Sequence, residues 1–211
     1  MSAAADIRRI LLARSLRAFG DGYVAVLLPV HLSRLGYDAL AVGAIATATL
    51  LGSALLTVAL GVFAHRVRRR RALLAASLLM AVTGFAFAGL SGLVPLLLVA
   101  FVGTLNPSSG DVSVFLPLEH TILAQAVPAS ERTAAFARYS FAGSVVGAVG
   151  ALAAGAVDWL APLLDPGTTI ALLFGLYGCL GLASLLLYRC LSPLAERADD
   201  APATPLGPSR R

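Results

Sequence analysis

Six long apolar runs, separated by short polar or helix-breaking links, dominate the pattern of this chain of 211 residues. About 20 apolar residues cross a bilayer as an α-helix, and each run is long enough to do so. We therefore predict an all-α membrane protein, a bundle of six transmembrane helices within residues 1–191. The predicted spans are 9–33, 40–64, 72–91, 93–124, 132–157 and 168–190.

Composition supports a lipid-facing surface. Hydrophobic residues make up 58% of the chain and charged residues 13%, against about 25% charged residues in a typical soluble domain. So few charges cannot cover a globule in water. The polar segment 192–211 is rich in Pro, Ala and Asp, and we expect it to be a disordered cytoplasmic linker.

Arginine placement predicts the orientation of the bundle. Ten arginines fall at the start of the chain, in the second and fourth links and after the sixth run, whereas the other three links hold Arg34 alone. The positive-inside rule then places both termini in the cytoplasm. Because the arginines lie at the ends of apolar runs, we exclude nucleic acid as a partner despite the basic pI of about 9.9. The ten are Arg8, Arg9, Arg66, Arg68, Arg69, Arg70, Arg71, Arg132, Arg189 and Arg197.

The fourth run is longer than a bilayer requires and contains a helix-breaking centre. Residues 93–124 would extend about 50 Å at 1.5 Å per residue, against a hydrocarbon core of about 30 Å. The centre reads Asn106, Pro107, Ser108, Ser109, Gly110, Asp111. We expect one interrupted or strongly kinked helix whose end projects into the cytoplasm. Broken backbone at membrane depth needs protein or water around it.

Two places within the runs are candidates for proton or substrate binding. The first is Asp21, which is either a proton or substrate site, with Arg17 beside it, or a structural charge paired with Arg14 or Arg17. The second is the broken segment, where Asn106, Ser108, Ser109 and Asp111 can surround a ligand, as broken helices do in several transporters. Alternatively, the break is a packing kink.

Three further groups of residues are candidates for smaller roles. Glu119 is either a gating charge paired with the cluster Arg66–Arg71 or a hydrated carboxylate at the interface. Arg138 faces a cavity or extends to the interface. Small residues on the fifth run are expected to permit close helix packing; they are Gly143, Gly147, Gly150 and Gly155. No metal-ligand spacing, P-loop or nucleophile motif occurs in the sequence, so we predict neither an enzyme nor a cofactor.

The link between the second and third runs resembles the signature loop of the major facilitator superfamily, Gly-x-Leu-Ala-Asp-Arg-x-Gly-Arg-Arg-x. Residues 61–71 match it at Gly61, Ala64, Arg66, Arg69 and Arg70. His65 replaces the family's Asp and Arg68 its Gly. In the family this Asp helps to lock one conformation, so a histidine implies an altered or pH-dependent lock.

The resemblance covers nearly the whole chain and implies a function. Residues 17–36 resemble the family's first span and the loop after it. Residues 127–132 resemble its link between spans four and five, and residues 106–119 are similar to a subgroup of bacterial members, which identifies no substrate. The family's two six-helix halves enclose the substrate, and this chain corresponds to the amino-terminal half.

Two functions from different classes follow. The first is a secondary transporter in the bacterial inner (plasma) membrane that moves a small solute by alternating access, either alone or coupled to protons through Asp21, Asp111 or Glu119. Its partners would be lipid, a small-molecule substrate and a second six-helix half, supplied by a longer chain or by a second copy. The alternative is a non-transporting or truncated membrane protein that binds a partner.

Overall fold

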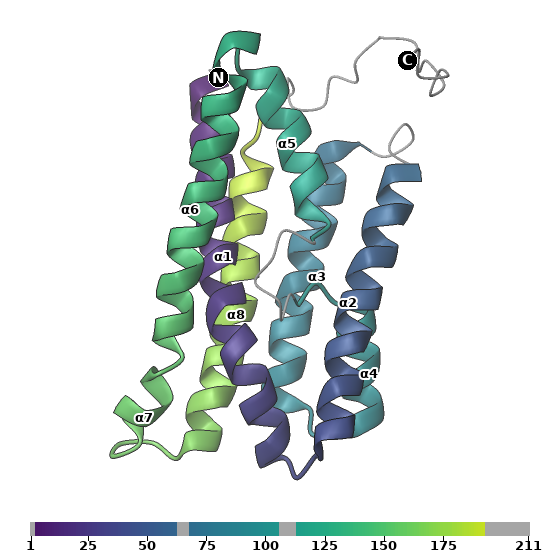
Figure 1. Cartoon of the computed structure of the whole chain (residues 1–211), viewed down its shortest axis with the longest axis vertical. Helices are drawn as coiled ribbons and strands as arrows, with labels where there is room; N and C mark the ends of the chain where they lie inside the picture. Colours follow the sequence, from purple (N-terminus) through teal and green to yellow (C-terminus); the bar gives the residue numbers. More distant parts are fainter. Residues whose placement is uncertain (1–2, 63–67, 106–112, 193–211) are drawn as a thin grey trace, which may run out of the picture.

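The computed structural model describes residues 3–62, 68–105 and 113–192. These residues form an elongated bundle of helices (Figure 1). The helices are α1 (Ala3–Arg34), α2 (Ala39–Val62), α3 (Arg69–Gly89), α4 (Leu93–Val102), α5 (Phe115–Ala126), the 3-10 turn η1 (Ala129–Glu131), α6 (Arg132–Ala153), α7 (Ala156–Leu160) and α8 (Pro166–Arg189).

Links that alternate along the chain lie at opposite ends of the bundle. The links α1–α2, α3–α4 and α7–α8 share one end, while the start of α1, the end of α8 and the α5–α6 link share the other (Figure 1). This is the arrangement that the arginine pattern predicts, although which end faces the cytoplasm stays a prediction. At the arginine-rich end, Ser192 ties the segment after α8 to the start of α1, because its backbone N–H donates to the Asp6 carboxylate (3.2 Å).

The first link shows how local sequence turns one helix into the next. Gly36 adopts a left-handed backbone (φ 87°), which suits glycine because it has no Cβ. The Tyr37 N–H then donates to the Leu32 carbonyl (3.1 Å), which caps the end of α1. Asp38 begins α2 by accepting a hydrogen bond from the Ala41 N–H (2.9 Å).

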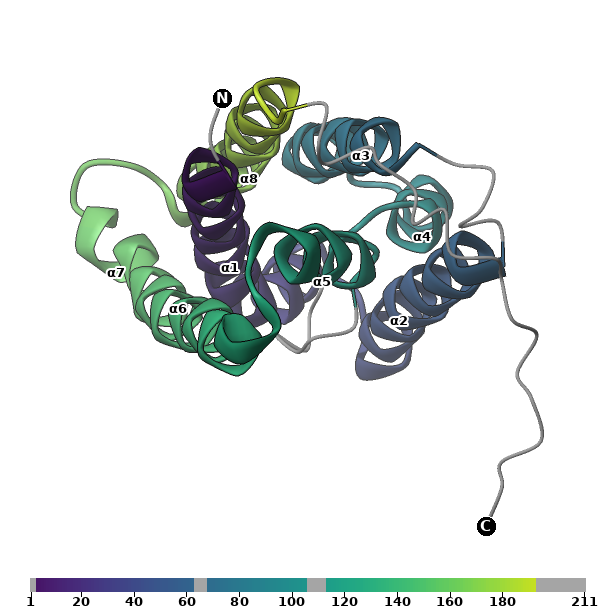
Figure 2. The same cartoon turned by 90° about the horizontal axis from the view of Figure 1, so that it is seen from above.

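Glycines set the closest helix packing. α1 lies between α6 and α8, and α3 packs along α8 (Figure 2). Gly150 of α6 faces the Phe19 carbonyl of α1, and Gly22 of α1 faces the Gly147 carbonyl, so a Cβ at Gly150 or Gly22 would collide with backbone. A Cβ built in ideal geometry at Gly147 would lie 3.5 Å from the Ala18 carbonyl oxygen.

The expected six spans are found only in part. Four helical segments within the described ranges are long and apolar enough to cross a membrane: Ala39–Val62, Arg69–Gly89, Ala129–Leu160 and Pro166–Arg189. α1 is long enough at 32 residues, but polar side chains such as Arg17 and Asp21 keep it out of this set. α4 and α5 have 10 and 12 residues and are each too short to span a bilayer.

The fourth predicted span is therefore two short helices. α4 ends at Val102, capped by Gly103, whose N–H donates to the Val99 carbonyl (2.8 Å). The next helix among the described residues begins at Phe115. Residues 106–112 lie outside the described residues, and with them the candidates Asn106, Ser108, Ser109 and Asp111.

The second piece, α5, lies among the other helices of the bundle, and the projection of its end into the cytoplasm stays a prediction. α5 packs against α1, α3 and α6 (Figure 2). The buried residues of α5 recur at helical spacing and therefore lie on one face. They are Phe115, Leu118, Glu119, Ile122 and Leu123. All of them except Glu119 join an apolar cluster that includes Ile10, Leu73, Tyr139 and Tyr188, so α5 is anchored by an apolar face that carries one carboxylate.

Candidate functional site

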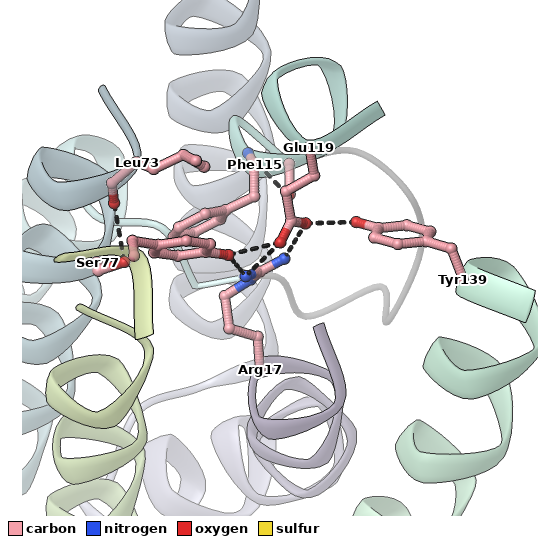
Figure 3. Close-up of polar contacts among 8 residues, drawn as sticks. Arg17, Leu73, Ser77, Phe115, Glu119 and Tyr139 are labelled. Atoms are coloured by element: carbon pink, nitrogen blue, oxygen red, sulfur yellow. Dashed lines mark hydrogen bonds and ion pairs between the residues drawn. The ribbon is translucent and has the colours of Figure 1, made fainter. Parts of the chain in front are cut away.

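A fully buried ion pair joins α1 to α5. Glu119 has no exposed surface and Arg17 is 2% exposed. The Arg17 guanidinium donates from both terminal nitrogens, with Nη2 2.5 Å from Oε2 and Nη1 3.2 Å from Oε1 (Figure 3). This two-point contact is the strongest geometry that arginine forms with a carboxylate.

Two tyrosines from two further helices complete the shell of Glu119. The Tyr139 hydroxyl of α6 donates to Oε2 at 2.5 Å (Figure 3), and the Tyr188 hydroxyl of α8 donates to Oε1 at 2.6 Å. Arg17 also donates to the Tyr188 hydroxyl. Each oxygen of Glu119 thus accepts one guanidinium N–H and one phenol O–H, so four helices meet on one carboxylate.

Aromatic rings and a second cation surround the pair. The Arg17 guanidinium lies over the Phe115 ring, 4.0 Å from its centroid, an arrangement that stabilises a desolvated cation. Arg14, one turn earlier on α1, lies 5.2 Å from the Tyr139 ring centroid. Its guanidinium fills the space beside Gly143, where an ideal Cβ would come within 2.5 Å of Nε.

Asp21 lies one turn along α1 from Arg17 and has its own partner on α8. It accepts a hydrogen bond from the Tyr177 hydroxyl at 3.0 Å. The same hydroxyl lies 3.4 Å from the Thr104 carbonyl, directly after α4. Of the two arginines expected beside Asp21, Arg17 forms its ion pair with Glu119 instead.

A comparison with known protein families identifies the family of this chain. The model of the Major Facilitator Superfamily matches residues 10–209, nearly the whole chain. The chain belongs to the Major Facilitator Superfamily. It is an integral, multi-pass membrane protein, and the members of its superfamily are transporters.

One curated relative is similar along most of this chain. The uncharacterized membrane protein YJR124C of Saccharomyces cerevisiae is 26% identical over 198 residues, which cover 92% of this chain and 44% of the yeast protein. The chain therefore spans less than half the length of the curated relative that it matches. The similarity identifies no substrate.

The superfamily's signature loop is described only at its edges. His65 and Arg66 lie outside the described residues, and Gly61 lies exposed on α2. Arg69 donates to the Gln125 side chain of α5 at 2.9 Å, and Arg70 donates to the Arg189 carbonyl at the end of α8. These two arginines therefore tie α3 to its neighbours at the arginine-rich end.

Glu119 differs from both of our expectations. The interpretation as a partner of the Arg66–Arg71 cluster is wrong for the described part of that cluster, since Glu119 pairs with Arg17. It is not a hydrated interfacial carboxylate either, because it has no exposed surface. The cause is the inward packing of α5, which hydropathy did not predict.

Other candidates lie away from the ion pair. Arg138 is exposed on α6, one residue from the buried Tyr139. Gly143, Gly147 and Gly150 face α1, whereas Gly155 lies beyond the end of α6, near the Leu152 carbonyl. Among the described residues, no three His, Cys, Asp or Glu side chains gather as metal ligands would.

Sequence reasoning missed the tyrosines. Tyr139, Tyr177 and Tyr188 are each at most 1% exposed, and each hydroxyl serves one of the two carboxylates. A signal was present, because a phenol inside an apolar run needs a hydrogen-bond partner. The three tyrosines in the fifth and sixth runs therefore pointed to buried acceptors.

Proposed function

We propose that this chain is part of a secondary transporter that moves a small solute by alternating access, with proton coupling through Glu119. The observation that carries this proposal is the fully buried Glu119 carboxylate, shared by helices α1, α5, α6 and α8. Membership of the superfamily supports the transporter class. Asp21 and the undescribed Asp111 are secondary candidates for the proton.

The physical argument concerns what happens when the helices move. An ionised carboxylate within a membrane is costly and needs compensation. Separating α1 from α5 would break the Arg17–Glu119 pair and leave two desolvated charges, which costs several kcal/mol. A proton on Glu119 removes one of those charges, so protonation lowers the barrier to rearrangement.

A second half completes the proposed transporter. The match to less than half of the yeast relative supports a longer chain as its source, and a second copy of this chain is the other source. The bacterial inner membrane stays the predicted location, based on the resemblance of residues 106–119 to bacterial members. The relative itself comes from yeast.

Proton flux in proteoliposomes tests the proposal. Candidate solutes are first selected because they raise the melting temperature of the purified full-length protein. Each is then added to liposomes that contain this protein and a trapped pH dye. We expect solute-driven proton entry in the wild type and its loss in Glu119→Gln. Glu131→Gln, which alters an exposed carboxylate in the α5–α6 link, is the matched control and should retain the flux.

The alternative predicts a different result. A partner-binding membrane protein without transport would bind no solute and give no flux in any variant. Flux that is equal in the wild type and Glu119→Gln would retain the transporter but refute coupling through Glu119. Testing Asp21→Asn in the same assay then decides whether Asp21 carries the proton instead.

A further inference from the structure

We infer that the transported solute carries a carboxylate group, which binds to Arg17, Tyr139 and Tyr188 in the place that the Glu119 carboxylate occupies. This inference deepens the proposed function and rests on it. Glu119 would act as an internal substitute for the solute: it fills the site while ionised and leaves it when protonated.

The geometry is that of a carboxylate receptor. Three side chains, from α1, α6 and α8, direct four hydrogen bonds to the two oxygens of one carboxylate, at 2.5–3.2 Å. The flat guanidinium lies against the Phe115 ring, which holds its plane. None of these donors depends on the Glu119 backbone, so a carboxylate from another molecule satisfies them equally well.

Charge balance favours an anionic solute. Among the described residues, Arg14 and Arg17 bring two basic side chains near the site, and Glu119 and Asp21 bring two carboxylates. A proton on Glu119 leaves one excess positive charge, which a solute carboxylate neutralises. A neutral solute would leave the Arg17 charge buried without its partner, which is strongly unfavourable, and a cationic solute would add to the excess.

The groups that face Glu119 from each neighbouring helix fit this exchange. α1 supplies Arg17 and Arg14, with Asp21 one turn away, and α6 and α8 supply Tyr139 and Tyr188. On α5 itself, the His120 ring lies 5.0 Å from the Tyr139 ring. On α3, the Ser77 hydroxyl donates to the Leu73 carbonyl of its own helix at 2.8 Å (Figure 3). Glu119 is the carboxylate bound directly by Arg17.

Chemical rescue provides the first test. The substitution Glu119→Ala removes the atoms of one acetate ion and leaves the three donor side chains in place. We expect sodium acetate to raise the melting temperature of the purified full-length variant by about 2–4 °C. Acetamide and sodium chloride at the same concentration should have no such effect, and Arg17→Gln combined with Glu119→Ala should abolish the rescue.

A second test uses a variant that keeps the side-chain volume. Glu119→Gln removes the competing charge, so we expect it to bind propionate equally at mildly acidic and mildly alkaline pH. The wild type should bind propionate more weakly as pH rises, by at most about tenfold for each unit of pH, because binding of one propionate would be coupled to uptake of one proton. Isothermal titration calorimetry measures both.

Each outcome decides the inference. Absence of both acetate rescue and propionate binding would overturn it, as would proton-coupled flux that is driven by neutral or cationic solutes and lost in Glu119→Gln. In the latter case the proposed function stands and the solute assignment falls. Rescue by acetate in a protein that shows no proton flux would instead retain the carboxylate site and refute the transport proposal.

Discussion

At the scale of single residues, Glu119 and Arg17 place opposite charges where water does not reach. The two residues are 102 positions apart in the sequence. Both were candidates from sequence because charges are costly in apolar runs. Their pairing could not be predicted, since it depends on which faces of α1 and α5 meet. The same limit explains why the sequence suggests Asp21, a neighbour on the same helix, as a partner for Arg17.

Breaking the pair should be more harmful than removing it. We expect Arg17→Gln to lower the free energy of unfolding by about 3–5 kcal/mol, because it leaves the Glu119 charge buried without its guanidinium. Adding Glu119→Gln should recover part of that loss. Denaturation of the wild type, the two single variants and the double variant in mixed detergent micelles measures the coupling free energy between Arg17 and Glu119. Additive losses in the double variant would contradict a direct pair.

At the scale of helices, contacts between small residues decide which neighbours lie closest. The sequence predicts a packing role for four glycines of the fifth run, and three of them, Gly143, Gly147 and Gly150, face α1. Sequence could not distinguish them from Gly155 or from Gly175, which has no neighbouring atom within 4 Å of an ideal Cβ. The partner of each helix face is decided by the whole bundle.

A matched pair of glycine substitutions tests this packing. Gly150→Ala should lower the free energy of unfolding by about 1–3 kcal/mol, because its methyl group would overlap the Phe19 carbonyl. Gly175→Ala should be neutral or stabilising by about 0.5–1 kcal/mol, since alanine favours helix and the space is open. Equal effects in thermal or micelle denaturation would argue against close α1–α6 packing.

The start of α8 provides a pH-dependent element. Asp165 caps the helix: it accepts hydrogen bonds from the Thr168 hydroxyl (2.5 Å) and the Thr168 N–H (2.9 Å). These bonds to Thr168 lower the pKa of the Asp165 carboxyl below its ordinary value of 3.8. A depressed folded-state pKa stabilises the fold above the unfolded value, and the contribution is lost as pH falls through the folded value.

We therefore expect Asp165→Ala to melt at a lower temperature than the wild type at neutral pH. The difference should shrink once pH falls below about 4, where the unfolded carboxyl protonates. Asp165→Asn, which can still accept from the Thr168 N–H, should lose less at neutral pH and show a weaker pH dependence. A difference that is constant with pH would refute the role of the ionised carboxyl.

At the scale of the whole molecule, alternate links gather at opposite ends of the bundle (Figure 1). The arginine pattern predicts that the end with Cys190 faces the cytoplasm, and Leu163, which is 80% exposed, marks the other end. A membrane-impermeant thiol reagent should label Leu163→Cys in intact cells, in a background with both native cysteines replaced. A variant that retains Cys190 alone should be labelled only after permeabilisation.

The sequence by itself determined the class of this protein: a helical membrane protein of the Major Facilitator Superfamily with few interior charges. Those properties follow from the cost of placing polar groups in lipid, which acts locally along each run. The tertiary structure decided that the fourth span is two helices, that α5 lies inside the bundle, and that Glu119 binds Arg17 and two tyrosines. These features depend on contacts between helices distant in sequence, where packing selects one partner among several that hydropathy allows.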